Sequence, residues 1–478
     1  MESKDEIQIS VLKGEKLFNK NTPFVINISS QNKDLVDNSR NNTDLICVID
    51  SSSSMARKKL NQVKESLKIL IDLMDKNDRL ALILFDSFAT NYFDLQYLTD
   101  ENKKKLKDKI NLIKTNFGTN IFSGLKIAVD IIKKANLENK NEERVTSIIL
   151  LSDGHDSLHN EEELSTSLKN ITKGFNLLFT LYTFGYGKYH DEKVLNKLAT
   201  LRDGSFYYVE NYNNVSEYFA CVLGGCISVI SQKAELNVKL LNNKCKIEKI
   251  YGLENLFESE LKDDFFKISI LQMKSGKEYT FVFEVYIDKK NINIGDELLD
   301  INFIYKDINN NNNIISKNIK YKYELISIDF LKANEEYIRI FVYSVLDSVM
   351  KLKEKGQKNK AKELLNKMKF WIKKNYKGNN KDLLLDVEKS YDLFGDDYGL
   401  LNSSAKYLRS QIRQNQFKKD GSNKIFCNTI QINLMKTVQL NSNLQLSSAN
   451  IPINIDNLAK SIDFGNHINY NFNEQIKK

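Results

Sequence analysis

The stretch Asp44 to Met55, DLICVIDSSSSM, joins an apolar run to an abrupt polar end. Leu45 to Ile49 predicts a strand buried on both faces, because such strands read as short continuous apolar runs. Asp50 and four serines follow directly. Asp50, Ser52 and Ser54 alternate along the chain, so their oxygens can face one point in an extended loop. Carboxylate and hydroxyl oxygens suit a hard cation such as Mg2+ better than zinc or copper.

The same letters also allow a purely structural interpretation. Serine is a frequent helix N-cap, and Ser54 or a neighbour could satisfy the free amides of a helix that opens near Ala56. On this segment alone, both interpretations stay open.

Two later segments favour the ligand site. Gly118-Thr119-Asn120 precedes a predicted helix over 121–134, which places the Thr119 hydroxyl near a helix start. The apolar strand predicted over 147–151 ends in Ser152-Asp153-Gly154, which gives a second carboxylate at a second strand end. Ligands of open α/β sheets bind at the carboxyl ends of the strands, so these segments can share one metal ion.

The whole pattern resembles the metal-ion-dependent adhesion site of von Willebrand factor type A domains. All five positions of that motif are filled, by Asp50, Ser52, Ser54, Thr119 and Asp153. The flanking segments LALILFDSFAT at 80–90 and TFGYGKYHD at 183–191 are similar to that family as well.

The resemblance covers roughly residues 44–230 and implies the fold and the ligand. It implies a doubly wound, mostly parallel α/β sheet of Rossmann-like type. The implied cofactor is Mg2+, or another hard divalent cation such as Ca2+ or Mn2+. Ser52 and Ser54 would bind it directly, and one or both aspartates partly through water. A carboxylate from a protein partner would complete the coordination.

A narrower resemblance begins at the last predicted helix of this domain. Tyr218 to Gln232 and Asn334 to Met368 are similar to von Willebrand A proteins that carry a following Vwaint region. Some members of that group have RING or Hint domains. The chain has neither, so the resemblance implies no ligase or self-splicing activity.

Composition excludes several classes of protein. The 478 residues are too many for one core, so we expect two or three domains. A net charge of +8 among 70 basic and 62 acidic side chains does not predict nucleic-acid binding. The five cysteines form no CxxC pair, so no zinc site is expected. The charged amino terminus and the lack of an apolar run of roughly 20 residues predict a cytoplasmic protein without a membrane span.

Changes in hydrophobic periodicity along the sequence divide the chain into five parts. These are N-terminal strands over 1–43 that join a sandwich, the A-type domain over 44–232, a β-sandwich over 233–326, an α-helical region over 327–420 and an extended or partly disordered tail over 421–478. We expect the last helix of the A-type domain over 213–231. Four helices are expected near 329–355, 358–376, 381–394 and 398–418.

We therefore predict an intracellular, divalent-metal-dependent protein–protein interaction module that is not an enzyme. A structural scaffold subunit with an incidental metal site is the alternative. A Mg-dependent phosphoryl-transfer enzyme is disfavoured, because Ser52 stands where haloacid-dehalogenase-like phosphatases need a second carboxylate. Phosphate-loop, HExxH and GxSxG motifs are absent as well. The sequence does not specify the oligomeric state.

Overall fold

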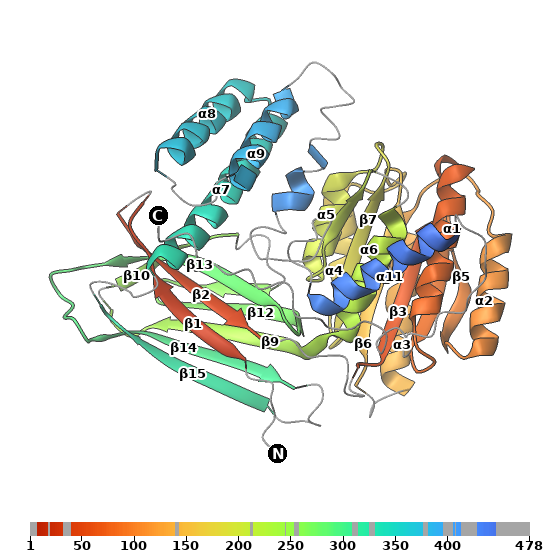
Figure 1. Ribbon diagram of the computed structural model, residues 1–478, viewed down its shortest axis with the longest axis horizontal. Coiled ribbons are helices and arrows are strands. Elements are labelled where there is room, and N and C mark those ends of the chain that lie inside the picture. Colours follow the sequence, from red (N-terminus) through yellow and green to blue (C-terminus); the bar gives the residue numbers. More distant parts are fainter. Residues whose placement is uncertain are drawn as a thin grey trace.

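The computed structural model describes residues 7–445 except for 18–19, 32–39, 139–142, 211–213, 244, 253–257, 308–313, 325–329, 376–380, 395–404, 407 and 413–427. Figure 1 shows three parts: a sheet with helices on both faces, a sandwich of two antiparallel sheets, and C-terminal helices. This arrangement confirms the predicted fold class.

The central sheet has six strands, and β3 lies in its middle. Their order is β5-β4-β3-β6-β7-β8, and every neighbouring pair is parallel except β4 with β5. All eight residues of β3 are buried, which explains its continuous apolar run. The strands are β3 (Thr43–Asp50), β4 (Arg79–Phe85), β5 (Ala89–Tyr97), β6 (Val145–Ser152), β7 (Phe179–Tyr186) and β8 (Phe206–Val209).

Helices cover both faces of this sheet. Side chains alternate along a strand, so Leu45, Cys47 and Ile49 of β3 join one core cluster, and Ile46 and Val48 join the other. The first cluster includes α1 (Lys58–Leu73), α2 (Asp100–Leu112) and α6 (Val215–Ile227). The second includes α3 (Ile121–Glu138), α4 (Glu161–Thr172) and α5 (Glu192–Leu201).

The structure corrects the end of the helix predicted over 213–231. Helix α6 stops at Ile227, and strand β9 (Val229–Leu240) begins two residues later. Val229 pairs with Lys274 in β12, so the β-branched residues at this junction extend a sheet rather than a helix. The first sandwich strand after the A domain therefore begins at Val229.

The sandwich consists of a four-stranded and a five-stranded sheet. The first has the order β1-β2-β13-β10, and the second has the order β11-β12-β9-β14-β15. The N-terminal strand β2 pairs with β13 along its whole length, so the chain start completes a sheet built from much later residues. The first sheet contains β1 (Gln8–Lys13), β2 (Thr22–Ser29), β10 (Cys245–Ile250) and β13 (Glu278–Ile287). The second adds β11 (Glu258–Leu261), β12 (Phe265–Lys274), β14 (Glu297–Lys306) and β15 (Ile314–Lys322) to β9.

The C-terminal helices pack on one another through their own core. They are α7 (Phe330–Glu354), α8 (Lys358–Asn375) and α9 (Lys381–Lys389), followed by a 3-10 segment (Ser390–Phe394). The fourth predicted helix, over 398–418, lies largely outside the described residues.

The expectation of an extended tail is wrong for residues 428–445. Helix α11 (Thr429–Gln445) lies across α6 (Figure 1). The Gln431 side chain is fully buried there and donates a hydrogen bond to the Cys221 carbonyl at 3.0 Å. All α6 residues from Tyr218 to Ile227 are buried, so this helix needs a cover on its outer side as well. Residues 446–478 lie outside the described part.

An ion-pair cluster ties the amino ends of the central strands together. The carboxylate of Asp44 accepts hydrogen bonds from Nε of Arg79 at 2.8 Å and from Nε of Arg144 at 2.7 Å. Both guanidinium groups lie over the Tyr97 ring. Asp44 is only 3% exposed, so the arginines compensate its buried charge.

Replacing that carboxylate should destabilise the protein strongly. Asp44→Asn leaves two largely buried guanidinium groups without their counter-ion, and we expect the free energy of unfolding to fall by about 3 kcal/mol. Urea denaturation measures this loss. Asp130→Asn breaks the solvent-exposed pair with Lys133 and serves as the control, with an expected change of about 0.5 kcal/mol or less. Equal losses in the two variants would contradict the role assigned to Asp44.

Candidate metal centre

Asp50 ends the central strand with its carboxylate fully buried. Its Oδ1 accepts a hydrogen bond from the Ser52 amide at 2.8 Å, and its Oδ2 accepts one from the Ser152 hydroxyl at 2.6 Å. Ser152 is the last residue of the neighbouring strand β6, so the carboxylate is oriented from two strand ends at once.

The loop after Asp50 is held in place by its backbone. The amide of Ser51 donates to the Phe85 carbonyl at 2.8 Å, and the Asn116 amide donates to the Ser51 carbonyl at 2.8 Å. Arg57, which precedes α1, has a φ of 65°, and no side chain caps that helix. Ser54 therefore does not act as the N-cap of α1, and the capping interpretation of the serines is wrong.

The serine hydroxyls instead connect the loop to the second carboxylate. Ser52 Oγ lies 2.9 Å from Ser54 Oγ, and Ser54 Oγ donates to Asp153 Oδ1 at 2.6 Å. The other oxygen of Asp153, which is 1% exposed, forms an ion pair with the ammonium group of Lys59 on α1. Four of the five predicted oxygen donors thus belong to one continuous network.

Thr119 lies beside this network. A methyl group placed on Gly154 would lie 3.7 Å from Thr119 Oγ1 and 4.0 Å from Ser54 Oγ, so both hydroxyls border the same space. Two hydrogen bonds with Ser157 fix the Thr119 backbone, at 3.2 Å to its amide and 2.7 Å to its carbonyl. The structure therefore brings all five predicted residues to the same edge of the sheet.

The sequence of this region matches one known family. The sequence model of the von Willebrand factor type A domain covers residues 44–220. Residues 44–220 form a von Willebrand factor type A domain. Domains of this kind generally serve as protein–protein interaction modules.

Known relatives match about a third of the chain. An uncharacterised protein of Synechocystis sp. is 32% identical over 168 residues, which are 35% of this chain and 38% of that protein. Inter-alpha-trypsin inhibitor heavy chain H4 of Bos taurus is 33% identical over 163 residues, which are 34% of this chain and 18% of that protein. The chain thus spans well under half the length of these relatives.

A solved structure extends the likeness in fold. The von Willebrand factor type A structure from Catenulispora acidiphila has a TM-score of 0.62 at 14% identity, covering 81% of this chain and 91% of its own. That share exceeds residues 44–220, so the similarity in fold continues beyond the A domain.

The donor set of the A domain fits a hard cation. Within the described part of the chain, no group of three or more His, Cys, Asp and Glu side chains is placed to hold a metal ion. A cation here would depend on hydroxyl oxygens beside two carboxylates, a set that suits Mg2+, Ca2+ or Mn2+ rather than zinc. The ammonium group of Lys59 at Asp153 shows that a positive charge is favourable at this point.

Two residues that position the site, Ser152 and Lys59, were not predicted from the sequence. Ser152 orients the Asp50 carboxylate, and Lys59 pairs with Asp153. Both contacts join residues about a hundred positions apart, and neither belongs to the motif. The place of Ser152 directly before Asp153 at a strand end was the one available signal.

Burial raises the pKa of the Asp50 carboxyl to about 6, although the hydrogen bonds from Ser152 and Ser52 oppose this rise. The nearby Asp153 raises that pKa further. The charged carboxylate is therefore costly in the folded A domain unless a cation accompanies it.

In the described helices, none is long and apolar enough to cross a membrane.

The raised pKa predicts a stabilising effect of Asp50→Asn in chelator. The folded protein binds the proton of Asp50 more tightly than the unfolded chain, so this carboxyl costs stability above pH 6, and the cost vanishes toward pH 4. In EDTA at about pH 7.5, the variant should gain about 1–3 kcal/mol in the free energy of unfolding. The gain should shrink as the pH falls through 6, as measured by urea denaturation. A gain that does not change with pH, or one shared by Asp130→Asn, would contradict this account.

Removing the ammonium group of Lys59 should tighten cation binding. Lys59→Met keeps the aliphatic stem but frees Asp153, and a partly exposed ion pair is worth about 1 kcal/mol, or roughly fivefold in affinity. Titration calorimetry with MgCl2 measures this change. Lys58→Met, at the exposed neighbouring position, is the matched control and should bind as the wild type does. Unchanged or weaker Mg2+ binding in Lys59→Met would refute the competition.

Proposed function

We propose that the A domain binds Mg2+, or a similar hard divalent cation, and uses it to capture an acidic side chain of a protein partner. Asp50, Ser52, Ser54, Thr119 and Asp153 would hold the cation. The coordination would be completed by an Asp or Glu of the partner.

One observation supports this proposal above all. Two buried carboxylates lie at neighbouring strand ends: Asp50 accepts a hydrogen bond from the Ser52 amide, and the hydroxyls of Ser52 and Ser54 continue the network to Asp153. Such a cluster is costly to bury in a folded protein, and a cation would relieve that cost. Three of the five donors are neutral, so a bound divalent cation would not be over-neutralised. An additional carboxylate would therefore still gain from binding it.

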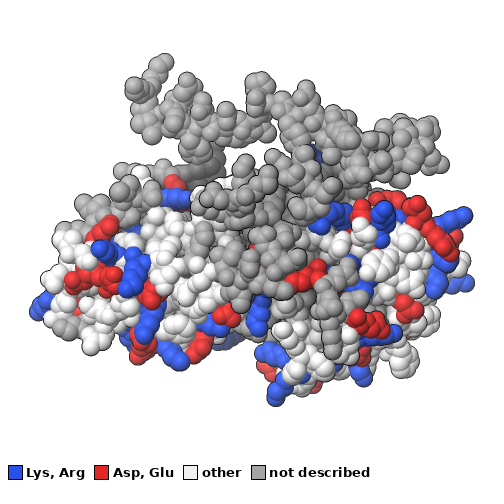
Figure 2. Space-filling view, turned by 90° about the horizontal axis from the view of Figure 1, so that it is seen from below, with Lys and Arg blue, Asp and Glu red and all other residues white. Residues whose placement is uncertain are grey.

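One face of the molecule, away from the candidate metal centre, gives no sign of a nucleic-acid site. On the face shown in Figure 2, lysine and arginine side chains are interspersed with aspartate and glutamate over the described residues. Nucleic acids bind to concentrated basic faces, which this mixed charge does not resemble.

The arrangement also argues against phosphoryl transfer. The residue two positions after Asp50 is Ser52, whose hydroxyl contacts Ser54, so a second carboxylate is missing from that position. A nucleophilic aspartate of the phosphatase kind needs this neighbour as its acid and base. The cluster is therefore better suited to binding than to turnover.

Mg2+ should stabilise the wild-type protein and not the variant Ser52→Ala/Ser54→Ala. The double substitution removes two neutral donors and leaves both carboxylates in place. At a Mg2+ concentration about a hundred times the dissociation constant, binding should add about 2.7 kcal/mol to the free energy of unfolding. Thermal unfolding with Mg2+ and with EDTA measures the difference.

Ser53→Ala is the matched control, because Ser53 lies exposed in the same loop. It should keep the full stabilisation by Mg2+. Partner capture is then compared among the three proteins, with and without EDTA. If the double variant captures the same partners as Ser53→Ala, the site is incidental and the chain is a scaffold.

A further inference from the structure

Exposed aromatic side chains gather at the strand-end edge of the A domain. Among the described residues, the three most exposed large aromatic side chains are Phe117 at 83%, Phe88 at 80% and Tyr189 at 75%. Leu158, at 64%, lies on the same edge. Single exposed apolar residues are common, but their gathering on the loops of one site is not expected by chance. We name these four residues the apolar rim.

Phe88 and Phe117 lie on two loops that are bonded to each other and to the serine loop. The Ser87 amide donates to the Phe117 carbonyl at 3.0 Å, and the Ser87 hydroxyl donates to the same oxygen at 2.7 Å. Asn116, the residue before Phe117, donates from its amide to the Ser51 carbonyl. The two phenylalanines are therefore held beside Asp50 by the backbone.

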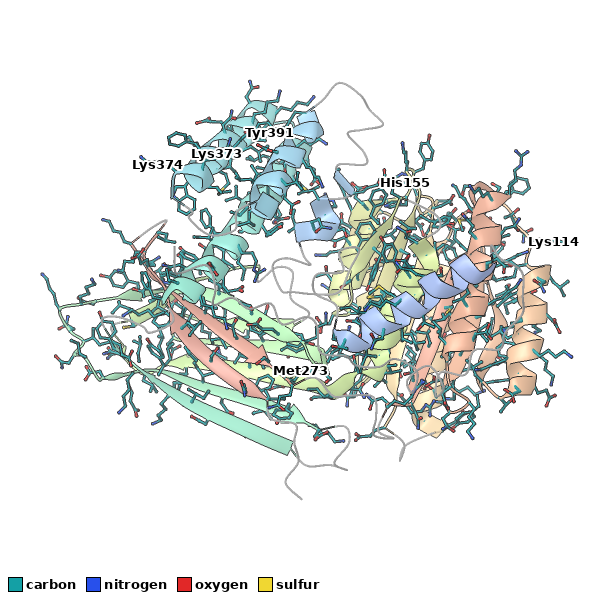
Figure 3. The ribbon with its side chains drawn as sticks, in the orientation of Figure 1. Lys114, His155, Met273, Lys373, Lys374 and Tyr391 are labelled. Carbon is teal, nitrogen blue, oxygen red and sulfur yellow. The ribbon has the colours of Figure 1, made fainter. Side chains whose placement is uncertain are left out.

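Leu158 and Tyr189 lie on the opposite loops. Ser157, which precedes Leu158, donates from its amide to the Thr119 carbonyl at 2.7 Å. The loop of Tyr189 is joined to the loop after Asp153 by a contact of 3.3 Å between His155 Nδ1 and Asp191 Oδ2. His155 lies at this edge in Figure 3. The apolar rim therefore comes from loops on different sides of the candidate metal centre.

These side chains contribute little to folding, because they bury little surface. Exposed aromatic side chains on a fixed backbone are instead well suited to binding, since they bury much area and lose little conformational freedom. Asp86 and Asp191 share these loops with Lys114 and Lys188, so the edge carries both signs of charge rather than the concentrated basic surface that a polyphosphate such as RNA or an anionic membrane requires. A single carboxylate among apolar side chains suits this combination of charge and surface.

We infer that the partner presents an Asp or Glu flanked by apolar side chains, which pack on the apolar rim while the acid reaches the metal centre. The inference rests on the proposed function and adds the chemistry of the neighbouring residues. The apolar rim then contributes more than the cation to the choice among acidic partners, because any exposed acid could reach the cation.

The test is a selection of peptides by the full-length protein. Disulfide-constrained random peptides displayed on phage are bound in Mg2+, eluted with EDTA and sequenced. The wild type should recover peptides that have an acid next to apolar residues. Phe88→Ser/Phe117→Ser should weaken the binding of such a peptide about tenfold or more, while its binding stays sensitive to EDTA.

Two controls separate the rim from the metal centre. Phe370→Ser removes an aromatic side chain that is 68% exposed on α8, outside the A domain, and should select the same peptides as the wild type. The rim variant should keep its stabilisation by Mg2+, which shows that it is folded and binds the cation.

Each outcome decides one of the two proposals. Acids with polar neighbours, or equal affinities of the rim variant and the wild type, overturn the apolar rim and leave the proposed function standing. If the recovered peptides lack acidic residues, or if EDTA elutes no peptides, the proposed function and the role of the apolar rim are both overturned.

Discussion

Burial of the Asp50 carboxylate at the end of the middle strand is the constraint on which the site depends. A carboxylate in this position must be hydrogen-bonded or accompanied by a positive charge. The amide of Ser52 and the hydroxyl of Ser152 provide hydrogen bonds but no charge. The tight serine loop, its backbone bonds to neighbouring loops and the second carboxylate at Asp153 all follow from the geometry around this one group.

Strand β3 carries a buried carboxylate at each end, and the two ends are treated differently. Asp44 lies between the guanidinium groups of Arg79 and Arg144, so its charge is satisfied within the fold. In the described structure Asp50 has no basic partner of its own, and burial raises its pKa. The charge of Asp44 at the amino end is therefore neutralised within the fold. The charge of Asp50 at the carboxyl end is not neutralised by a basic side chain of the described structure. This contrast between two buried acids of one strand supports the proposal that Asp50 belongs to a ligand site.

The sequence predicted the sheet well, because the sheet depends on local patterns, and the five residues that it singled out lie at one edge of that sheet. The apolar run before Asp50 and the alternation of Asp50, Ser52 and Ser54 can be read directly, and the strand ending at Asp153 is equally clear. The structure brings these residues together, although coordination of a cation by them stays a prediction, as does the likeness to proteins with a Vwaint region. Contacts between distant segments could not be predicted. Lys59 gives no signal as a partner of Asp153, and the fold of α11 depends on α6, not on its own weak amphipathic pattern.

The same long-range packing explains why binding should occur at the strand ends. Helices α1, α2 and α6 cover one face of the A-domain sheet, with α11 over α6, and helices α3 to α5 cover the other face. The loops at the carboxyl ends of the strands lie outside this cover, except for the loop over 187–191, where the carbonyls of Lys188 and His190 accept hydrogen bonds from Lys406. Phe88 and Phe117 would be read from sequence as ordinary core aromatics, yet the backbone bonds of these loops hold them outside. Since the rigid sheet fixes the loops, the apolar side chains and the buried acids keep a constant relation to each other. A partner that contacts both the apolar side chains and the site of the buried acids can bind without a conformational change of the A domain.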